Sequence, residues 1–277
     1  MVVLHRLAVP VSNVGIPDKG EVMNVLLSLG KIRARLILAI SMILLAIVVI
    51  IIISTLDSEG ARVVLTDYDA SYYPFTIQNV MWVFFFLGFG ELLYRYMQAR
   101  YTMATVKQHL LPEGESEILT RKETMALYGK VKHRSHFPDD LPSILKKLIL
   151  HFQATDSIAQ TQDLFSSQVD LKYNRMDTDY SMIRYLTWVI PTFGFIGTVI
   201  GISMALSFAA SSDPQAATFL AGLTEKLGVA FYTTLVALVM SAILVFLMHI
   251  VQSYEEGSLF KLEEYVLDNF INRLYNK

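Results

Sequence analysis

Four long apolar runs constrain the fold of this chain more than any other feature of its sequence. They cover residues 36–54, 77–97, 186–208 and 229–250. Each is close to the roughly 20 residues that a helix needs to cross the hydrocarbon core of a bilayer. The first run is too long for the apolar part of a secretory signal. The sequence therefore predicts an all-α, polytopic membrane protein with four transmembrane helices.

Composition supports a membrane protein and excludes several other classes. Hydrophobic residues make up 53% of the chain and charged residues only 17%, and the net charge of −2 gives no reason to expect a nucleic-acid partner. The chain has no cysteine, which excludes disulfides and thiolate metal sites. His133 and His136 could form a metal pair by spacing, but no third ligand is near, so a solvated loop is favoured. No phosphate loop, nucleophile motif or carboxylate pair is present, and we expect neither enzymatic activity nor a cofactor.

The distribution of Lys and Arg predicts the topology. The segments 55–76 and 209–228 contain only Arg62 and Lys226, whereas five basic residues precede the first run and the others lie mainly in the large loop 98–185 and the tail. Cytoplasmic segments carry the excess of Lys and Arg. We therefore expect both termini and the large loop in the cytoplasm, with the two short loops outside.

The polar segments have helical patterns of their own. Residues 1–35 form an irregular or interfacial lead. The second apolar helix is expected to run on to Leu111 and stop before a proline, and a shorter helix covers 117–131. No Pro or Gly occurs in 143–185, so we expect one long helix that leads directly into the third apolar run. The tail, 251–277, is amphipathic and packs on these helices or on a neighbouring subunit; its apolar stripe comprises Leu259, Leu262, Val266, Phe270 and Leu274.

Small residues form a matching stripe on each of the last two apolar runs. In both, the spacing of four, three and four residues places the members on one helical face. The stripes comprise Gly194, Thr198, Gly201 and Ala205 in the third run, and Ala230, Thr234, Ala237 and Ser241 in the fourth. Gly197 and Gly201 also form a small-xxx-small pair, which lets another backbone approach closely. Spacing alone favours a tightly packed helix over a pore-lining one, and the threonines could simply bond to their own helix carbonyls.

Two motifs in these runs resemble a known family. Pro191-x-x-Gly194-x-x-Gly197-Thr198-Val199-x-Gly201 resembles the first pore helix of the MotA/TolQ/ExbB ion-channel family. Leu227-Gly-Val-Ala-Phe-Tyr-Thr-Thr-Leu-x-x-Leu238 resembles the second. The resemblance covers Thr187 to Ile250, and it departs from the family at Ala237, where glycine is usual. The large second loop is similar to the MotA branch and the short tail to the TolQ/ExbB branch.

The resemblance implies an ion-driven motor subunit in the bacterial inner membrane. It implies a homo-oligomeric ring, a pentamer in this family, around two helices of a single-span partner of MotB, TolR or ExbD type. Each partner helix carries one Asp, and H⁺ or Na⁺ is the transported ion. Its pore-lining positions correspond here to Pro191, Ala230, Thr198, Thr233, Thr234 and Ser241. We expect Gly194, Gly197 and Gly201 to pack helices closely, including helices of different copies.

The ionisable residues in the apolar runs help to distinguish an ion-driven motor subunit from a transporter, an enzyme and a scaffold. The third and fourth runs contain no carboxylate, so one chain is an incomplete ion path. A secondary transporter would carry its own midplane acid or broken helix, and a membrane enzyme would need a catalytic constellation. A membrane scaffold would account for the glycines but not for the threonines. Glu91 lies in the second run with Arg95 one turn later, and we interpret the two as a structural ion pair.

Overall fold

The computed structural model describes residues 19–56, 58–67, 70–114, 118–132 and 140–275, and within these ranges the structure is helical. The expected all-α fold is confirmed. Four helices contain segments long and apolar enough to cross a membrane. They are α1 (Lys19–Ser54), α3 (Ile77–Val106), α6 (Ile158–Ser211) and α7 (Phe219–Asn269).

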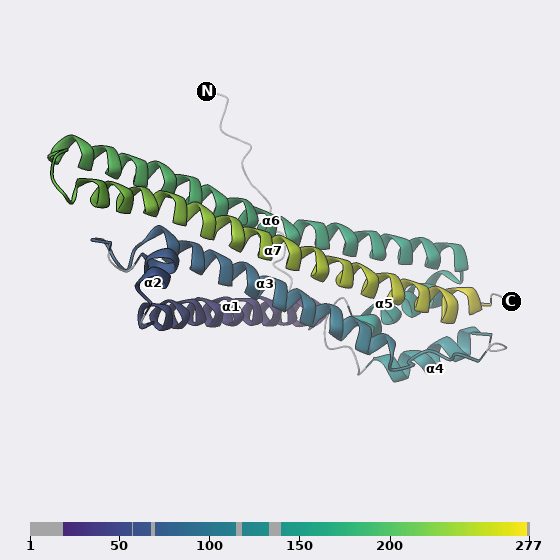
Figure 1. Cartoon of the computed structure of the whole chain (residues 1–277). Helices are drawn as coiled ribbons and strands as arrows, with labels where there is room; N and C mark the ends of the chain where they lie inside the picture. The colour runs from purple at the N-terminus through teal and green to yellow at the C-terminus, as the bar shows by residue number, and fades with distance from the viewer. Residues whose placement is uncertain (1–18, 57, 68–69, 115–117, 133–139, 276–277) are drawn as a thin grey trace, which may run out of the picture.

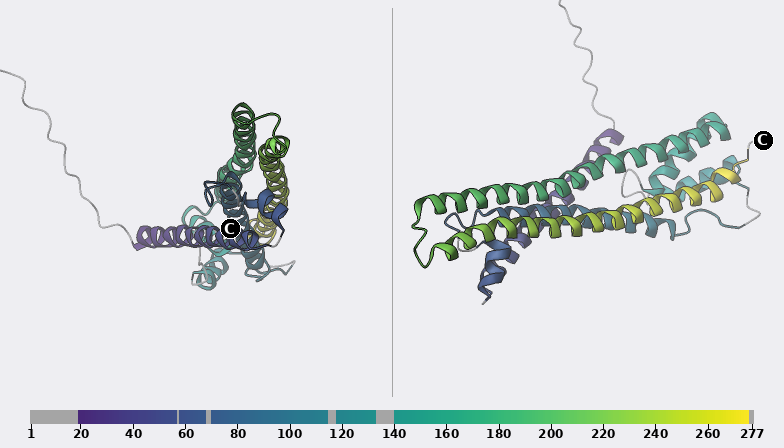
Figure 2. Two further views of the ribbon diagram at one scale, coloured as in Figure 1. Left: turned by 60° about the vertical axis from the view of Figure 1, so that its left-hand side comes forward. Right: turned by 45° about the horizontal axis from the view of Figure 1, so that its top comes forward.

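Helices α6 and α7 form an antiparallel hairpin that runs the whole length of the molecule (Figure 1). Helix α3 lies along this hairpin and contacts both of its helices, while α1 packs mainly on α3. The closed end of the hairpin extends beyond the ends of α1 and α3 (Figures 1 and 2). The short helices α4 (Arg121–Val131) and α5 (Leu141–Thr155) pack at the opposite end, where the C-terminus lies.

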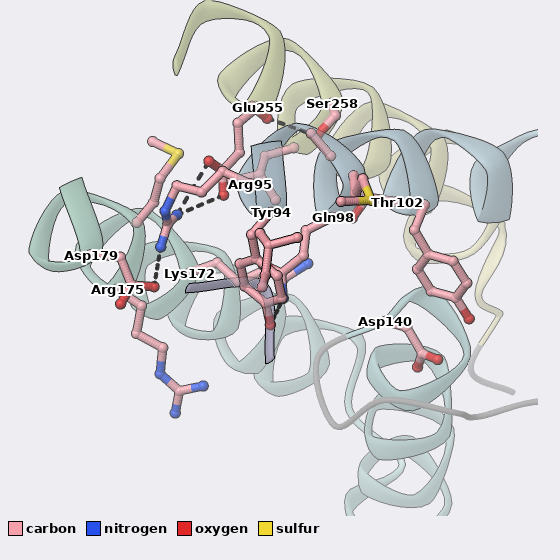
Figure 3. A pocket seen from close by; sticks show the side chains of 16 residues that line it. Tyr94, Arg95, Gln98, Thr102, Asp140, Lys172, Arg175, Asp179, Glu255 and Ser258 are labelled. Atoms are coloured by element: carbon pink, nitrogen blue, oxygen red, sulfur yellow. Dashed lines mark hydrogen bonds and ion pairs between the residues drawn. The ribbon is translucent and has the colours of Figure 1, made fainter. Parts of the chain in front are cut away.

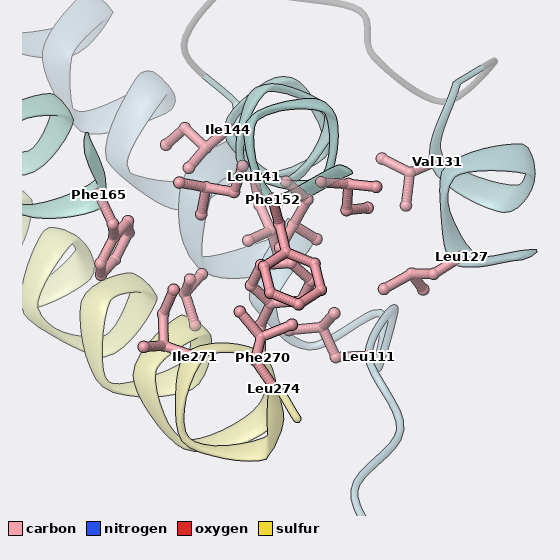
Figure 4. Packing of buried hydrophobic residues seen from close by; sticks show 14 of the residues in the cluster. Leu111, Leu127, Val131, Leu141, Ile144, Phe152, Phe165, Phe270, Ile271 and Leu274 are labelled. Carbon is pink, nitrogen blue, oxygen red and sulfur yellow. The ribbon is translucent and has the colours of Figure 1, made fainter. Parts of the chain in front are cut away.

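The buried apolar residues form two separate cores. The first, here called the spanning core, joins α3, α6 and α7, and comprises Met81, Leu92, Met176, Tyr180, Ile183, Leu186, Ile190, Val236, Ala237, Met240, Leu244, Met248, Val251 and Leu259. The second, here called the terminal core, joins α4, α5 and the ends of α6 and α7 (Figure 4). It comprises Leu111, Leu119, Leu127, Val131, Leu141, Ile144, Leu145, Leu148, Ile149, Phe152, Phe165, Val169, Leu262, Val266, Phe270, Ile271 and Leu274. The chain therefore has a membrane-type bundle and a small globular end that share two continuous helices.

The expectation of one unbroken helix over 143–185 is wrong. Helix α5 ends at Thr155, and Asp156 adopts the left-handed conformation with φ of 51°. Ser157 then caps α6 by accepting a hydrogen bond from the Gln160 N–H. Asp visits the left-handed region more readily than most residues, so a helix can end here without Gly or Pro. From Ile158 onward α6 does lead into the third apolar run without a break, as expected.

Two helix boundaries and one additional helix also differ from the expectations. Helix α3 ends at Val106 rather than Leu111, close to a left-handed residue at His109. Helix α7 begins at Phe219 rather than at residue 229, so the connection after α6 is shorter than expected. A short helix, α2 (Glu59–Thr66), lies in the segment expected to be a loop. It is held by hydrogen bonds to its C-terminal carbonyls, including one from Trp82 Nε1 to the Leu65 oxygen at 3.0 Å.

The amphipathic tail continues α7 and packs within its own chain. Its stripe residues are buried, Leu259 in the spanning core and the others in the terminal core. After the short 3₁₀ helix η1 (Ile271–Arg273), Leu274 forms an isolated bridge with Leu119, which precedes α4. The sequence left open whether this stripe packs on the chain's own helices or on a neighbouring subunit. In the structure the chain's own helices cover it.

Candidate functional site: a hydroxyl pair between α6 and α7

The small stripes of α6 and α7 face each other inside one chain. A Cβ atom added at Gly197 would lie 2.5 Å from Thr233 Oγ1, and one added at Gly201 would lie 2.7 Å from the Ala230 backbone nitrogen. Gly194 is similarly close to Ala237, where a Cβ atom would lie 2.5 Å from the alanine Cβ. The glycines thus allow α6 and α7 to approach closely. The face assigned to contacts between copies, however, is already covered by the neighbouring helix of the same chain.

The contact between the small stripes of α6 and α7 is here called the α6–α7 seam. Thr198 and Thr234 lie opposite each other across this seam, and their hydroxyl groups are hydrogen-bonded to each other. Thr198 Oγ1 also lies 3.2 Å from the carbonyl oxygens of Gly194 and Ala230. Thr234 Oγ1 lies 3.0 Å from the Gly194 oxygen and 3.4 Å from that of Ala230. Two hydroxyls and two carbonyls therefore form one cluster of four oxygen atoms in otherwise apolar helices.

The cluster is accessible from one side because both threonines are only half-buried. Thr233, by contrast, is 1% exposed, and its hydroxyl donates to the Ala230 carbonyl of its own helix at 3.0 Å. Thr233 therefore has a packing contact with Gly197 and a satisfied hydroxyl. Ala230 is fully buried and contributes its carbonyl rather than a side chain.

Pro191 and Ser241, both expected to line the pore, are connected through a third residue. Proline has no backbone N–H, so a proline inside a helix leaves the carbonyl four residues earlier without its usual donor. For Pro191 that carbonyl belongs to Thr187, and Ser241 Oγ donates to it from α7 at 2.8 Å. Ser241 thus replaces the hydrogen bond that Pro191 removes, which makes this pair structural.

A network of charged side chains joins all four long helices and is here called the Arg95 network. Figure 3 shows Arg95 with two of its partners, Asp179 and Glu255. The network comprises Arg35, Glu91, Arg95, Asp179, Tyr180 and Glu255. Arg95 is only 2% exposed and pairs with Glu91 at 3.7 Å, Asp179 at 2.5 Å and Glu255 at 3.1 Å. The guanidinium also lies 4.9 Å from the centroid of the Tyr180 ring.

The remaining contacts of the network bind α1 and α7 to this centre. Arg35 of α1 pairs with Glu91, and lies 3.6 Å from Asp179. The Tyr180 hydroxyl donates to Glu255 at 3.0 Å. The expected Glu91–Arg95 pair is therefore confirmed but is a small part of a larger cluster. Sequence reasoning missed Asp179, Tyr180 and Glu255 as its partners because they lie 84 to 160 positions from Arg95 along the chain and leave no local pattern.

A cavity of about 500 Å³ lies beside this network, between α3, α6, α7 and the start of α5 (Figure 3). Its polar wall includes Arg95, Lys172, Arg175, Asp140, Asp179 and Glu255, and its apolar wall includes Met97, Met176 and Leu259. Three basic and three acidic residues line it, so its charge favours neither anions nor cations. His133 and His136 lie outside the described residues.

The fold and the hydroxyl cluster define a polytopic α-helical membrane protein with a polar site between two close-packed helices. Comparison with protein families supports this class: residues 139–263 match the model of the MotA/TolQ/ExbB proton channel family. The matched region contains α5, the whole of α6 and most of α7. No curated protein and no solved structure matches the chain. The matched family is described as one of proton channels.

Proposed function

We propose that this chain is the ring-forming subunit of an ion-driven motor in the bacterial cytoplasmic membrane. Helices α6 and α7 of several copies surround the transmembrane helices of a single-span partner of MotB, TolR or ExbD type. Each partner helix carries one Asp. Flow of H⁺ or Na⁺ through this arrangement is converted into mechanical work. The match to a proton channel family over α6 and α7 supports this proposal.

The observation that carries the proposal is the Thr198–Thr234 pair. Two hydroxyls and two carbonyls can hold a water molecule, a protonated carboxyl group or a desolvated cation, whereas lipid provides no hydrogen bonds at all. Neither threonine can titrate at physiological pH, so the group that carries the charge must come from elsewhere. A carboxyl group on a partner helix, placed against the half-exposed side of the pair, completes the ion path.

The energy source follows from the same arrangement. A membrane potential is worth roughly 2.3 kcal/mol per elementary charge per 100 mV. A carboxylate that leaves water becomes protonated because the charged form is disfavoured in an apolar site. The partner Asp is alternately protonated and deprotonated. Each of these two states favours a different packing of the partner helix against the ring, and alternation between the two packings is the basis of a motor.

Removal of the two hydroxyls tests this proposal. Thr198→Val and Thr234→Val preserve side-chain shape but delete the hydrogen-bonding groups. We expect normal membrane levels and loss of ion flux in cells that contain the partner, with the larger loss in the double variant. Thr233→Val should have a milder effect, because that hydroxyl bonds only within its own helix. H⁺ flux is measured with a pH-sensitive dye and Na⁺ flux with a Na⁺-sensitive dye, so that transport of the two ions is distinguished.

Thr192→Val is the matched control. Thr192 lies in the same apolar run, and its hydroxyl donates to the Trp188 carbonyl of its own helix at 2.9 Å. It should retain full flux. Full flux in the Thr198→Val, Thr234→Val double variant would contradict the ion-path assignment and would favour a scaffold, which has no use for the hydroxyls.

A further inference from the structure

The two cores of this protein meet within one turn of α7, and a cavity lies beside this junction. On α7 the spanning core ends at Leu259 and the terminal core begins at Leu262. On α6 the corresponding members are Met176 and Val169, and among partly buried residues Tyr173 contacts both cores. The cavity of about 500 Å³ lies at this level, lined by Met176, Ser258 and Leu259. On the side of this cavity the junction therefore lacks the close packing that makes a protein interior rigid.

Beside this cavity, α7 contains a residue that favours the helical conformation poorly. Gly257 lies inside this 51-residue helix, where glycine is a poor helix former. Unlike the glycines of the α6–α7 seam, it has no steric reason to be glycine, because a Cβ atom added there would meet nothing within 4 Å. The next residue, Ser258, is buried beside the cavity, and its hydroxyl donates to the Glu255 carbonyl at 2.8 Å. Back-bonding serines and Gly/Ser pairs are typical sites of helix bending.

We propose that α7 bends at Gly257–Ser258, with the adjacent cavity providing the space, so that the terminal core moves as a unit relative to the spanning region. The Arg95 network fixes α7 to α3 and α6 through Glu255, on the spanning side of the bend. Helix α6 has no Gly or Pro near this level and follows by gradual curvature, as long helices do. This proposal rests on the fold alone and does not depend on the proposed ion-driven function.

Spin-label distance measurements across the bend provide the test. The chain has no cysteine, so Met125→Cys on α4 and Met182→Cys on α6 introduce the only two thiols. Both side chains are about half exposed, at 52% and 50%, and they lie on opposite sides of the proposed bend. The labelled full-length protein is diluted with unlabelled chain in lipid nanodiscs, so that distances within one chain dominate. We expect a broad or two-component distance distribution.

Two variants and one control make the result decisive. Gly257→Ala, which adds a methyl group without a clash, should reduce the distribution to a single narrow component and leave thermal stability equal or higher. Ala99→Leu, which fills the cavity from α3, should also narrow it. Gly129→Ala on α4 is the matched control, because its Cβ also meets nothing within 4 Å, and it should leave the distribution unchanged. A narrow distribution in the parent, or one that Gly257→Ala does not alter, would overturn the proposal.

Discussion

The roles of Pro191 and Ser241 become clear only from a contact between residues that are far apart along the chain. Both belong to the expected pore-lining set, and neither position alone suggests the other. The structure connects them because the Thr187 carbonyl, left without an N–H donor by Pro191, accepts a hydrogen bond from Ser241. In a membrane-spanning helix a freed carbonyl needs such a partner, since lipid cannot supply one.

This explanation predicts a non-additive pair of substitutions. Ser241→Ala should destabilise the protein by about 1–3 kcal/mol, the usual cost of an unsatisfied buried polar group. Pro191→Ala restores the N–H donor, so in that background Ser241→Ala should cost close to nothing. Unfolding of the purified variants in detergent measures both values. An equal cost in the two backgrounds would show that Ser241 does not compensate for the proline.

Substitution by alanine should have different costs at Gly201 of the α6–α7 seam and at Gly88 of α3, because the added methyl group would contact different atoms. At Gly201 the added atom would contact the Ala230 backbone at 2.7 Å, which cannot move without shifting α7. We expect Gly201→Ala to cost about 1–3 kcal/mol by overpacking. At Gly88 on α3 the obstacle is the end of the Leu244 side chain at 2.8 Å, which can rotate, so Gly88→Ala is the milder control. Comparison of their melting temperatures in detergent checks this order, and equal temperatures would contradict it.

For individual helices, the spacing of residues in the sequence predicted the apolar runs and stripes. It did not predict helix ends or short helices that are stabilised by contacts with other helices. The apolar runs, the small stripes and the tail stripe were recognisable because they repeat at helical spacing. The break at Asp156 was not, since it uses neither Gly nor Pro. Helix α2 was also missed. It has a capping serine at Ser58 and an amphipathic pattern, but it is only eight residues long, and contacts from Trp82 and Thr76 also hold it in place.

The Arg95 network is the element-scale contact with the clearest energetic consequence. Removing Arg95 leaves Glu255 and Asp179 without their shared cation, and breaking a buried ion pair costs about 3–5 kcal/mol. We therefore expect Arg95→Leu to lower stability strongly. Arg184 pairs with Asp177 at 3.1 Å on the surface, and Arg184→Leu should change little. Thermal unfolding in detergent compares the two, and a similar, small effect of both would refute a structural role for the network.

At the scale of the whole molecule, the sequence predicted the helical class and the two pore-helix motifs, whereas the packing partners came from the structure. The position of the small stripes illustrates the difference. Their spacing showed that a helix packs there, but spacing carries no information on whether that helix belongs to the same chain. Because Gly194, Gly197 and Gly201 are covered by α7 of the same chain, the ring that we propose would form through other faces of the hairpin. Candidate surfaces are its exposed apolar faces, which include Val199, Leu206, Phe231 and Phe246.

We propose that one chain is an incomplete ion path and that several copies together form a closed ring. Native mass spectrometry of the full-length protein, released from nanodiscs in mild detergent, tests this claim most directly. We expect a single homo-oligomer of defined copy number, five if the family resemblance extends to assembly, together with a heavier species when a single-span partner is co-expressed. A protein that remains monomeric at all concentrations, with or without the partner, would contradict it.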